Sequence, residues 1–250
     1  MTGLLQGENL LFLHGAGGRG LIWQQQLLAF PKSVAPDLPW HPGPSRPSGQ
    51  STAGTWGAAR WGVNRYLAAV RAYLGRASAP RIIAGHSLGG AIALLWALTV
   101  SREVQGLILI GTGTRLRVSP VVLATLRADY NRGLDQLIAL WFSPRAKPRL
   151  KEKSQVLLRT VAPEVLIAEL QAADAFDVST DVGRIGVPTL VMCGSDDQVM
   201  PPAASRQLHK EIPGSRLVII EGAGHMVMLE QPRATNDAIR AFLSGLHGNG

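Results

Sequence analysis

The stretch "RIIAGHSLGG", Arg81 to Gly90, runs from an apolar segment into a corner of small residues with one serine, Ser87, at its tip. Its pattern, G-x-S-x-G, places a glycine two residues before and two residues after that serine. A sharp strand-to-helix turn that exposes a serine hydroxyl needs small neighbours at these two positions. Because a chain with 28 glycines can also produce the pattern by chance, its meaning depends on the rest of the sequence.

The segments on either side of the motif fit such a turn. Arg81–Ala84 is apolar and of strand length, and Ala91–Val100 reads as an apolar helix. A hydroxyl that projects from this kind of corner, beside a helix N-terminus, is well placed to act as a nucleophile. The local context therefore favours a nucleophilic Ser87 over a serine in an ordinary glycine-rich turn.

Apolar runs of strand length recur along the chain, and most are apolar throughout rather than alternating. Such runs are typical of parallel strands that are buried on both faces. The expected strands are Leu10–Leu13, Val34–Ala35, Arg81–Ala84, Leu107–Ile110, Thr189–Met192 and Leu217–Ile220. The expected helices between them are Ile22–Ala29, Thr55–Leu74, Gly90–Val100, Pro202–Glu211 and Pro232–Leu246. This alternation predicts an α/β fold with a mostly parallel central sheet flanked by helices, and functional groups at the carboxyl ends of its strands.

Two regions interrupt the alternation. Residues 35–52 contain five prolines and predict a long loop. From about residue 114 to residue 181 the strand pattern disappears and only helix-like segments remain. These segments are Val121–Tyr130, Leu134–Phe142, Arg149–Thr160 and Pro163–Phe176. We therefore expect a core built from residues 1–113 and 182–250, with an all-helical cap, or lid, inserted as residues 114–181.

The composition is that of a folded globular protein with a basic surface. Hydrophobic residues make up 46% of the chain and charged residues 17%, and the net charge is +8. A positive balance can favour anionic partners, but no basic motif interleaved with aromatic residues is present. The basic run Arg145–Lys153 is most simply a solvated helix face. We expect no nucleic-acid partner.

Cysteine usage and hydropathy indicate the compartment. The single cysteine, Cys193, excludes an internal disulfide framework and a cysteine-based zinc site, and suits a reducing compartment. The N-terminal segment lacks a basic n-region, and the longest apolar run, Ala91–Val100, is about half a membrane span. We expect a cytoplasmic protein without a membrane partner, either a monomer or a homodimer. No pattern implies a metal or an organic cofactor.

A nucleophilic serine needs a histidine that accepts its proton and a carboxylate that orients the histidine. Among the six histidines, His225 lies in a glycine-rich loop directly after the last expected strand, where it can reach the carboxyl edge of the sheet. We expect His86, next to the serine, to point away from it across the turn. The other histidines end the first strand or lie in the proline-rich loop, in an amphipathic helix and at the C-terminus: His14, His41, His209 and His247.

The carboxylate is expected to leave a strand between the serine and the histidine. The stretch "VPTLVMCGSDDQVMP" supplies an apolar strand and a glycine turn, followed by Asp196 and Asp197. An ordinary Asp-rich turn is the alternative interpretation. The strand that ends near Gly111 offers no rival, because the following "GTGTR" contains no carboxylate.

The same chemistry needs two backbone N–H groups aimed at the developing negative charge. Leu88, directly after the serine, offers one of them. The glycine loop in "LLFLHGAGGRG", Leu10–Gly20, lets the backbone approach a ligand and offers the other. A phosphate or dinucleotide site is a weaker interpretation of this loop, because it lacks the third glycine of the dinucleotide pattern and a Walker lysine.

Taken together, these motifs resemble the α/β-hydrolase superfamily, in the form of a serine esterase with a helical cap. The resemblance covers nearly the whole chain: "LFLHGAGG", "PDLPWHPGPS", "GHSLGG", "VPTLVMCGSDDQVMP" and "GAGHMVMLEQP", with serine, aspartate and histidine in the family's order. It implies that Ser87 is the nucleophile and His225 the general base and then acid. It also implies Asp197 rather than Asp196 as the orienting carboxylate, because the family's aspartate lies three residues after a glycine.

The resemblance extends to the oxyanion hole and the pocket. It implies backbone N–H donors from Ala16 and Leu88, with Gly17 as the fallback for Ala16, and a structural role for His14. The pocket candidates are Gly17, Tyr130, Trp141, Phe142 and Met226, with Phe176 as a further aromatic residue of the lid. Aromatic residues at helical spacing more often pack inside the lid than line a site.

The expected function is acyl transfer to water, as a carboxylesterase that acts on small to medium apolar esters. The fold and the triad leave related reactions open: hydrolysis of lactones, thioesters, amides or C–C bonds, perhydrolysis and hydroxynitrile lysis. A non-catalytic ligand receptor is an alternative from another class. Dehalogenation is disfavoured, because it uses an aspartate at the position of Ser87.

Overall fold

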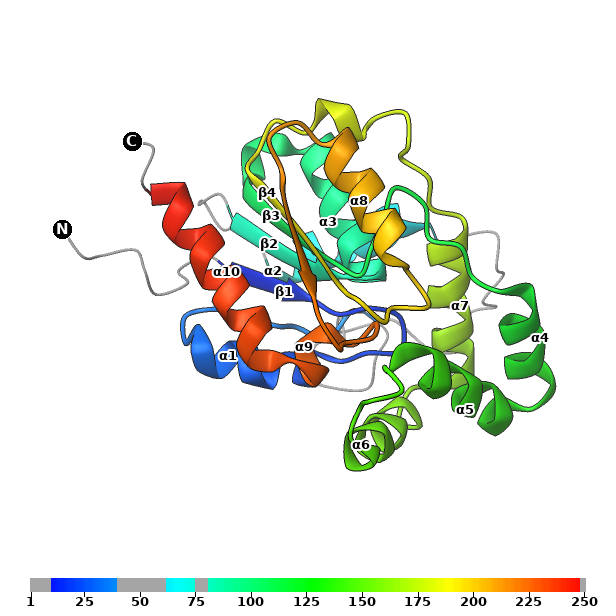
Figure 1. Cartoon of the computed structure of the whole chain (residues 1–250). Helices are drawn as coiled ribbons and strands as arrows, with labels where there is room; N and C mark the ends of the chain where they lie inside the picture. Colours follow the sequence, from blue (N-terminus) through cyan, green and yellow to red (C-terminus); the bar gives the residue numbers. More distant parts are fainter. Residues whose placement is uncertain (1–9, 40–61, 75–80, 248–250) are drawn as a thin grey trace.

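The computed structural model describes residues 10–39, 62–74 and 81–247. In this part of the chain, five parallel strands form one sheet in the order β1-β2-β3-β4-β5 (Figure 1). The strands are β1 (Leu10–Leu13), β2 (Arg81–His86), β3 (Val104–Ile110), β4 (Thr189–Gly194) and β5 (Arg216–Ile220). The structure thus confirms the predicted α/β fold with a parallel central sheet.

One expected strand does not form. Val34 makes only an isolated parallel bridge to Leu11 at the edge of the sheet, through hydrogen bonds with Leu10 and Phe12. The next residue that could pair on the same side is Pro36, which has no N–H to donate, so the ladder stops there. The prediction of a strand at Val34–Ala35 was therefore wrong.

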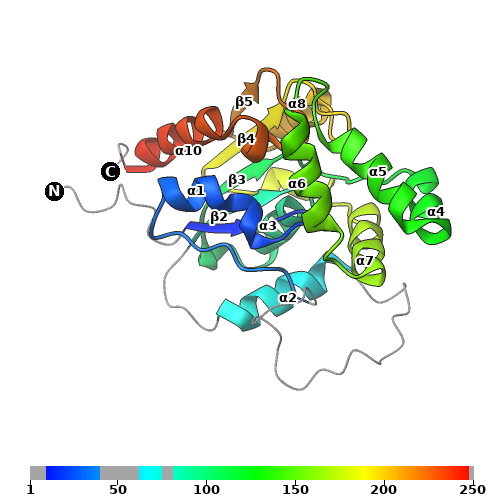
Figure 2. The same cartoon turned by 90° about the horizontal axis from the view of Figure 1, so that it is seen from below.

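Helices cover both faces of the sheet, which explains why its strands are apolar throughout. One face is covered by the 3₁₀ turn η1 (Gly20–Trp23), α1 (Gln24–Ala29), α9 (Val227–Glu230) and α10 (Pro232–His247). The other is covered by α2 (Val63–Leu74), α3 (Leu88–Thr99) and α8 (Pro202–Glu211), as Figures 1 and 2 show. Alternate residues of β1 enter opposite cores: Phe12 stacks on Trp23 with ring centroids 4.8 Å apart, whereas Leu11 and Leu13 face α2 and α3.

Four helices follow one another between β3 and β4, and we call residues 114–181 the helical segment. They are α4 (Pro120–Ala128), α5 (Tyr130–Trp141), α6 (Pro148–Leu158) and α7 (Pro163–Asp174). Proline occupies the first position of α4, α6 and α7, where its missing N–H costs nothing. In α5 the side chain of Asp129 caps the N-terminus by accepting a hydrogen bond from the N–H of Arg132. Figure 1 shows α4, α5 and α6 grouped at one side of the sheet core, with α7 beside them.

Some expectations fall outside the described ranges. Most of the predicted proline-rich loop, residues 35–52, and the first part of the predicted helix Thr55–Leu74 lie in residues 40–61. None of the helices within the described ranges combines the length and the apolar character that crossing a membrane requires.

Candidate active site

Ser87 lies in the sharp turn between β2 and α3. Its φ of 52° and ψ of −116° make it the only non-glycine residue with a positive φ in the described part of the chain. A conformation of this kind costs about 1–3 kcal/mol and persists only where its surroundings hold it. Here the Ser87 N–H donates to the Ile110 carbonyl at 3.0 Å, and the Ser87 carbonyl accepts from the Ala91 N–H at 3.1 Å and the Thr112 hydroxyl at 3.0 Å. The turn therefore fixes the serine at the carboxyl end of the sheet.

The two glycines of the motif are required by packing. A Cβ atom on Gly85 would lie 2.3 Å from the carbonyl oxygen of Gly89. A Cβ atom on Gly89 would lie 2.3 Å from the carbonyl oxygen of Leu13, at the end of β1. Both distances are far below van der Waals contact, so any side chain at either position would push α3 away from the sheet. The small neighbours that the sequence suggested are a geometric condition of this turn.

His225 is held by a buried carboxylate. It lies in the loop between β5 and α9, and its Nδ1 is 2.9 Å from Oδ2 of Asp197, with both side chains almost fully buried. Oδ1 of Asp197 accepts two further hydrogen bonds, from the N–H groups of Val199 at 2.9 Å and Met200 at 2.8 Å. Because a carboxylate accepts, Nδ1 of His225 carries the proton and Nε2 is left as the basic nitrogen.

The neighbouring carboxylate, Asp196, has different partners. It accepts hydrogen bonds from the hydroxyl groups of Ser143 at 2.7 Å and Ser195 at 2.9 Å, and these lower its pKa. The structure thus directs two adjacent aspartates to different places, and only Asp197 contacts the histidine.

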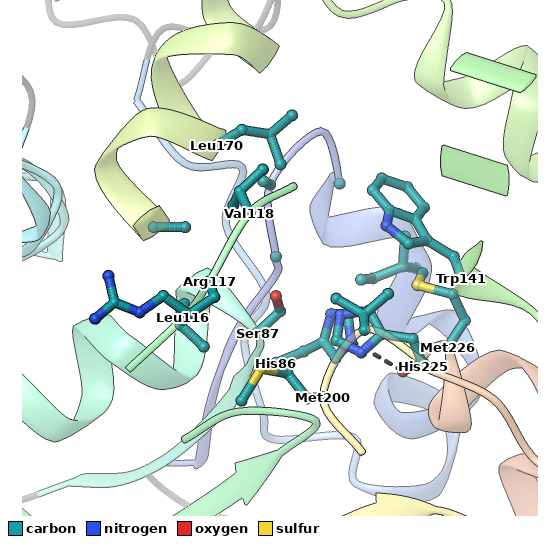
Figure 3. Close-up of a pocket in the computed structure, with 16 residues that line it drawn as sticks. His86, Ser87, Leu116, Arg117, Val118, Trp141, Leu170, Met200, His225 and Met226 are labelled. Carbon is teal, nitrogen blue, oxygen red and sulfur yellow. Dashed lines mark hydrogen bonds between the residues drawn. The ribbon is translucent and has the colours of Figure 1, made fainter. Parts of the chain in front are cut away.

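Ser87 and His225 line the same pocket, a small cavity of about 50 Å³. Figure 3 shows both side chains projecting into it, the serine from the turn after β2 and the histidine from the loop after β5. No hydrogen bond joins these two residues in the described structure. Catalytic hydrogen bonds are often long in apo enzymes and tighten when substrate binds.

The loop after β1 forms a tight turn against this pocket. The N–H of Gly18 donates to the carbonyl of Gly15 at 3.0 Å, and Gly17, the third residue of the turn, has a φ of +66° that favours glycine. Ala16 lines the pocket and Gly17 does not. The N–H of Gly17 instead donates to Oε2 of Glu169 at 2.7 Å, so this fallback donor is already engaged.

Two backbone N–H groups remain as candidate oxyanion donors, those of Ala16 and Leu88. Leu88 is the first residue of α3, where N–H groups have no partner inside the helix and the helix dipole favours negative charge. Within the described ranges, neither N–H donates a hydrogen bond.

The pocket candidates divide into two groups. Trp141 and Met226 line the pocket, but Tyr130 and Phe142 do not. Tyr130 donates its hydroxyl to the carbonyl of Val161 inside the helical segment, and Phe142 is buried in the core. Phe176 is also buried away from the pocket.

The sequence did not indicate the other walls of the pocket, because they come from loops or single helix positions without a periodic signal. These residues are Ile22, Leu116, Arg117, Val118, Leu170, Ala173, Val199 and Met200. Apart from Arg117, all of them are apolar.

His86 has a role that the sequence did not suggest. Its ring lies 4.5 Å from the His225 ring, and it lines the same pocket as Ser87. Its Nε2 donates to the backbone carbonyl of His225 at 3.0 Å. Burial and the nearby His225 lower the pKa of His86 well below 6.5, so this imidazole stays neutral. Its hydrogen bond supports the loop between β5 and α9 that carries His225.

The other described histidines have structural contacts. His14 is fully buried, and its Nε2 accepts the N–H of Leu38 at 2.7 Å. Nδ1 of His209 lies 2.8 Å from the hydroxyl oxygen of Ser215. Among the residues with described side chains, no three histidine, cysteine, aspartate or glutamate residues come together as a metal site. His41 and the side chain of His247 lie outside the described part of the chain.

Comparisons with known proteins agree with this geometry. The model of the alpha/beta hydrolase family matches residues 10–238. A pimeloyl-[acyl-carrier protein] methyl ester esterase of Neisseria meningitidis serogroup B is 32% identical over 181 residues, which cover 67% of this chain and 70% of that protein. The solved structure of a thermophilic esterase is 32% identical, with a TM-score of 0.81 over 96% of this chain and 90% of that one. The structure of Est816, described as an N-acyl homoserine lactone degrading enzyme, is 25% identical, with a TM-score of 0.80 over 94% and 93% of the two chains. The chain belongs to the alpha/beta hydrolase family.

Proposed function

We propose that this protein is a serine hydrolase that cleaves carboxylic esters through an acyl-enzyme. Ser87 is the nucleophile, His225 the general base and then acid, and Asp197 the carboxylate that orients the histidine. One observation carries the proposal: a serine in a strained strand-to-helix turn opens into the same pocket as a histidine whose Nδ1 is fixed by a buried aspartate. The esterase names of similar proteins support the same reaction class.

In the first half-reaction, Ser87 Oγ attacks the ester carbonyl and His225 Nε2 takes the hydroxyl proton. Asp197 stays ionised and stabilises the imidazolium that forms. The N–H groups of Ala16 and Leu88 hold the negative oxygen of the tetrahedral intermediate, and losing one such donor typically costs about 3–4 kcal/mol. The intermediate then collapses, and the proton on His225 passes to the departing alkoxide.

In the second half-reaction, His225 takes a proton from water, which attacks the acyl-enzyme carbonyl. The same two N–H groups hold the second tetrahedral intermediate. Its collapse releases the carboxylic acid, and the proton returns from His225 to Ser87 Oγ. The reaction consumes one water for each ester and leaves the enzyme unchanged.

We further propose that residues 114–181 act as a cap over the site and select small to medium apolar acyl groups. Trp141 of α5 and Leu170 and Ala173 of α7 supply apolar walls to a pocket of about 50 Å³. This size and lining favour a short acyl chain over a bulky or charged one. The single cysteine, Cys193, is buried and free, which suits the reducing cytoplasm that we propose as the compartment.

Lactone hydrolysis is the second candidate. A lactone is a cyclic ester and needs the same nucleophile and oxyanion donors. The observation that favours it is the likeness to Est816 over nearly the whole chain.

The test is turnover of p-nitrophenyl acetate, butyrate and octanoate by the full chain, beside lactones, thioesters and amides of matched acyl length. Ser87→Ala and His225→Ala should each lower kcat/KM for the preferred ester by about four or more orders of magnitude. Ser244→Ala removes an exposed hydroxyl on α10 and serves as the matched control. Ester turnover that survives Ser87→Ala would contradict the proposal.

A further inference from the structure

Glu169 is a buried carboxylate that the proposed triad does not use. It lies on α7 in the helical segment, with no solvent exposure. Its Oε2 accepts a hydrogen bond from the N–H of Gly17 at 2.7 Å. Burying an ionisable side chain is costly unless specific contacts compensate, and one such contact here is with Gly17, the residue next to Ala16 in the proposed oxyanion hole.

The turn that contains these residues is anchored to the helical segment. It is closed by the hydrogen bond from Gly18 to Gly15, and the φ of +66° at its third residue is that of a type II turn. Glu169 accepts the N–H of Gly17, which belongs to the central peptide of this turn, and so anchors the turn to α7.

The helical segment also presses on the turn directly. A Cβ atom on Gly17 would lie 2.4 Å from a methyl carbon of Leu158 and 2.8 Å from one of Leu166. On the core side, Tyr66 of α2 is buried, and its pKa is raised by burial and by the charge of Glu169. The carboxylate thus lies where α7 and the turn after β1 meet.

We propose that Glu169 is a positioning residue for the oxyanion hole. By anchoring the N–H of Gly17, it holds the turn in place, and with it the N–H of the neighbouring residue Ala16, which is the proposed donor to the tetrahedral oxygen. The inference rests on the proposed function, and it adds that the helical segment sets catalytic geometry as well as walling the pocket. Oxyanion donors act through their alignment, so a small displacement of this turn affects the transition state more than the bound substrate.

The test compares three substitutions in the full chain. Glu169→Met keeps the approximate size of the side chain and removes the acceptor of the Gly17 N–H. Glu169→Asp keeps the carboxylate but shortens the side chain, which moves the acceptor away from the Gly17 N–H. Glu169→Gln keeps an acceptor oxygen. Glu164→Met, at an exposed position on the same helix, is the matched control. For each variant we would measure kcat and KM with p-nitrophenyl acetate, inhibition by phenylboronic acid, and Tm. The boronate forms a tetrahedral adduct with the serine.

Glu169→Met should lower kcat by about 10- to 1,000-fold, and the upper value is the one typical of losing one oxyanion donor. The inhibition constant of phenylboronic acid should rise by a comparable factor, because the boronate adduct needs the same donors. KM should change by less than about threefold, because ground-state binding is not involved. Glu169→Asp should also lower kcat, Glu169→Gln should recover most of the loss, and the control should match the wild type.

A folded Glu169→Met variant with wild-type kcat would overturn the inference, as would a change confined to KM or Tm, or a Gln variant as impaired as the Met variant. If the Glu169→Met variant does not fold, the kcat of the Glu169→Asp variant is the deciding measurement. A wild-type kcat in the Glu169→Asp variant would overturn the inference. An active wild type with unaffected variants refutes the role of Glu169 alone. A wild type without ester turnover refutes both this role and the proposed function.

Discussion

Asp196 and Asp197 follow β4 as neighbours, yet their surroundings suit them to different tasks. Asp197 is buried and accepts hydrogen bonds from His225 and from two backbone N–H groups, whereas Asp196 binds two serine hydroxyls. The resemblance to the family implied Asp197 rather than Asp196, and the hydrogen bonds give a physical reason for that choice. A carboxylate held from both sides can fix an imidazole in one tautomer and orientation.

The first prediction concerns this pair. Asp197→Asn should lower kcat by about 10⁴-fold, because the amide cannot stabilise the correct tautomer of His225 or its charged form. Asp196→Asn is the matched control and should lower kcat far less, since the carboxylate of Asp196 binds two serine hydroxyls and not the histidine. Steady-state kinetics of both variants on one ester decide the point, and the reverse order of effects would refute the assignment.

His86 gives a prediction about pH. Its pKa is far below 6.5 in the folded protein, so the unfolded chain takes up a proton that the folded chain does not as the pH falls below 6.5. Stability linked to His86 is therefore complete above that pH and is lost as the pH falls towards the folded pKa. His86→Gln, which keeps an N–H donor for the His225 carbonyl and cannot titrate, should flatten this dependence.

The pH dependence linked to His86 is tested by measuring the free energy of unfolding in urea for the wild type and the His86→Gln variant at pH 7.5, 6.5 and 5.5. The other histidines titrate in both proteins, so the difference between the two pH profiles isolates His86. Parallel profiles would contradict the prediction.

At the scale of elements, the sequence is most informative where an apolar run is bounded by turn residues. β1 and α8 have the bounds that the sequence predicted, whereas the four helices of the helical segment differ from the prediction by several residues at some ends. Val34 failed as a strand because a proline stops its pairing. The hydrogen bond between Gly17 and Glu169 joins residues 152 positions apart, and no local sequence pattern can predict such a contact.

One such long-range contact ties the helical segment to the histidine loop. Oε1 of Glu230 accepts the N–H of Gly224 and Oε2 accepts the N–H of Ser143, both at 2.9 Å. The N–H of Met226 donates to the carbonyl of Trp141 at 3.1 Å. The segment that follows α5 and the loop that carries His225 are therefore held by one carboxylate.

Glu230→Gln should destabilise the protein by about 1–3 kcal/mol, because its amide can accept only one of the two N–H groups and leaves the other unpaired. Urea unfolding at pH 7 measures the loss. Glu221→Gln, at an exposed position shortly before the same loop, is the control and should leave stability unchanged. Equal stability of the Glu230→Gln variant and the wild type would contradict this role of the carboxylate.

At the scale of the whole molecule, the pocket forms where the carboxyl ends of β1, β2, β3, β4 and β5 meet the helical segment. Loops after these strands supply Ala16, Ser87, Leu116, Met200 and His225. The fold class could be predicted, and the three candidate triad residues could be picked out, because each rests on a local motif in a fixed order. The pocket walls could not, because they depend on how the helical segment packs against the sheet edge.

Trp141 is the largest wall residue and should limit acyl length. Trp141→Ala should raise kcat/KM for p-nitrophenyl octanoate relative to acetate by about tenfold or more, because the removed ring leaves room for additional methylene groups. Tyr130→Phe, at the first residue of the same helix and outside the pocket, is the control and should keep the wild-type preference. An unchanged ratio in the Trp141→Ala variant would place the acyl chain elsewhere.

Covalent labelling with a fluorophosphonate tests the central claim most directly, because the probe reacts only with an activated serine. Mass spectrometry of the folded, full chain should find one phosphonyl group per molecule, on the peptide that contains Ser87. Ester turnover should fall in step with labelling, and Ser87→Ala should take up no label while Ser244→Ala labels like the wild type. A folded protein that hydrolyses esters without label on Ser87 would contradict the claim that this serine is the nucleophile.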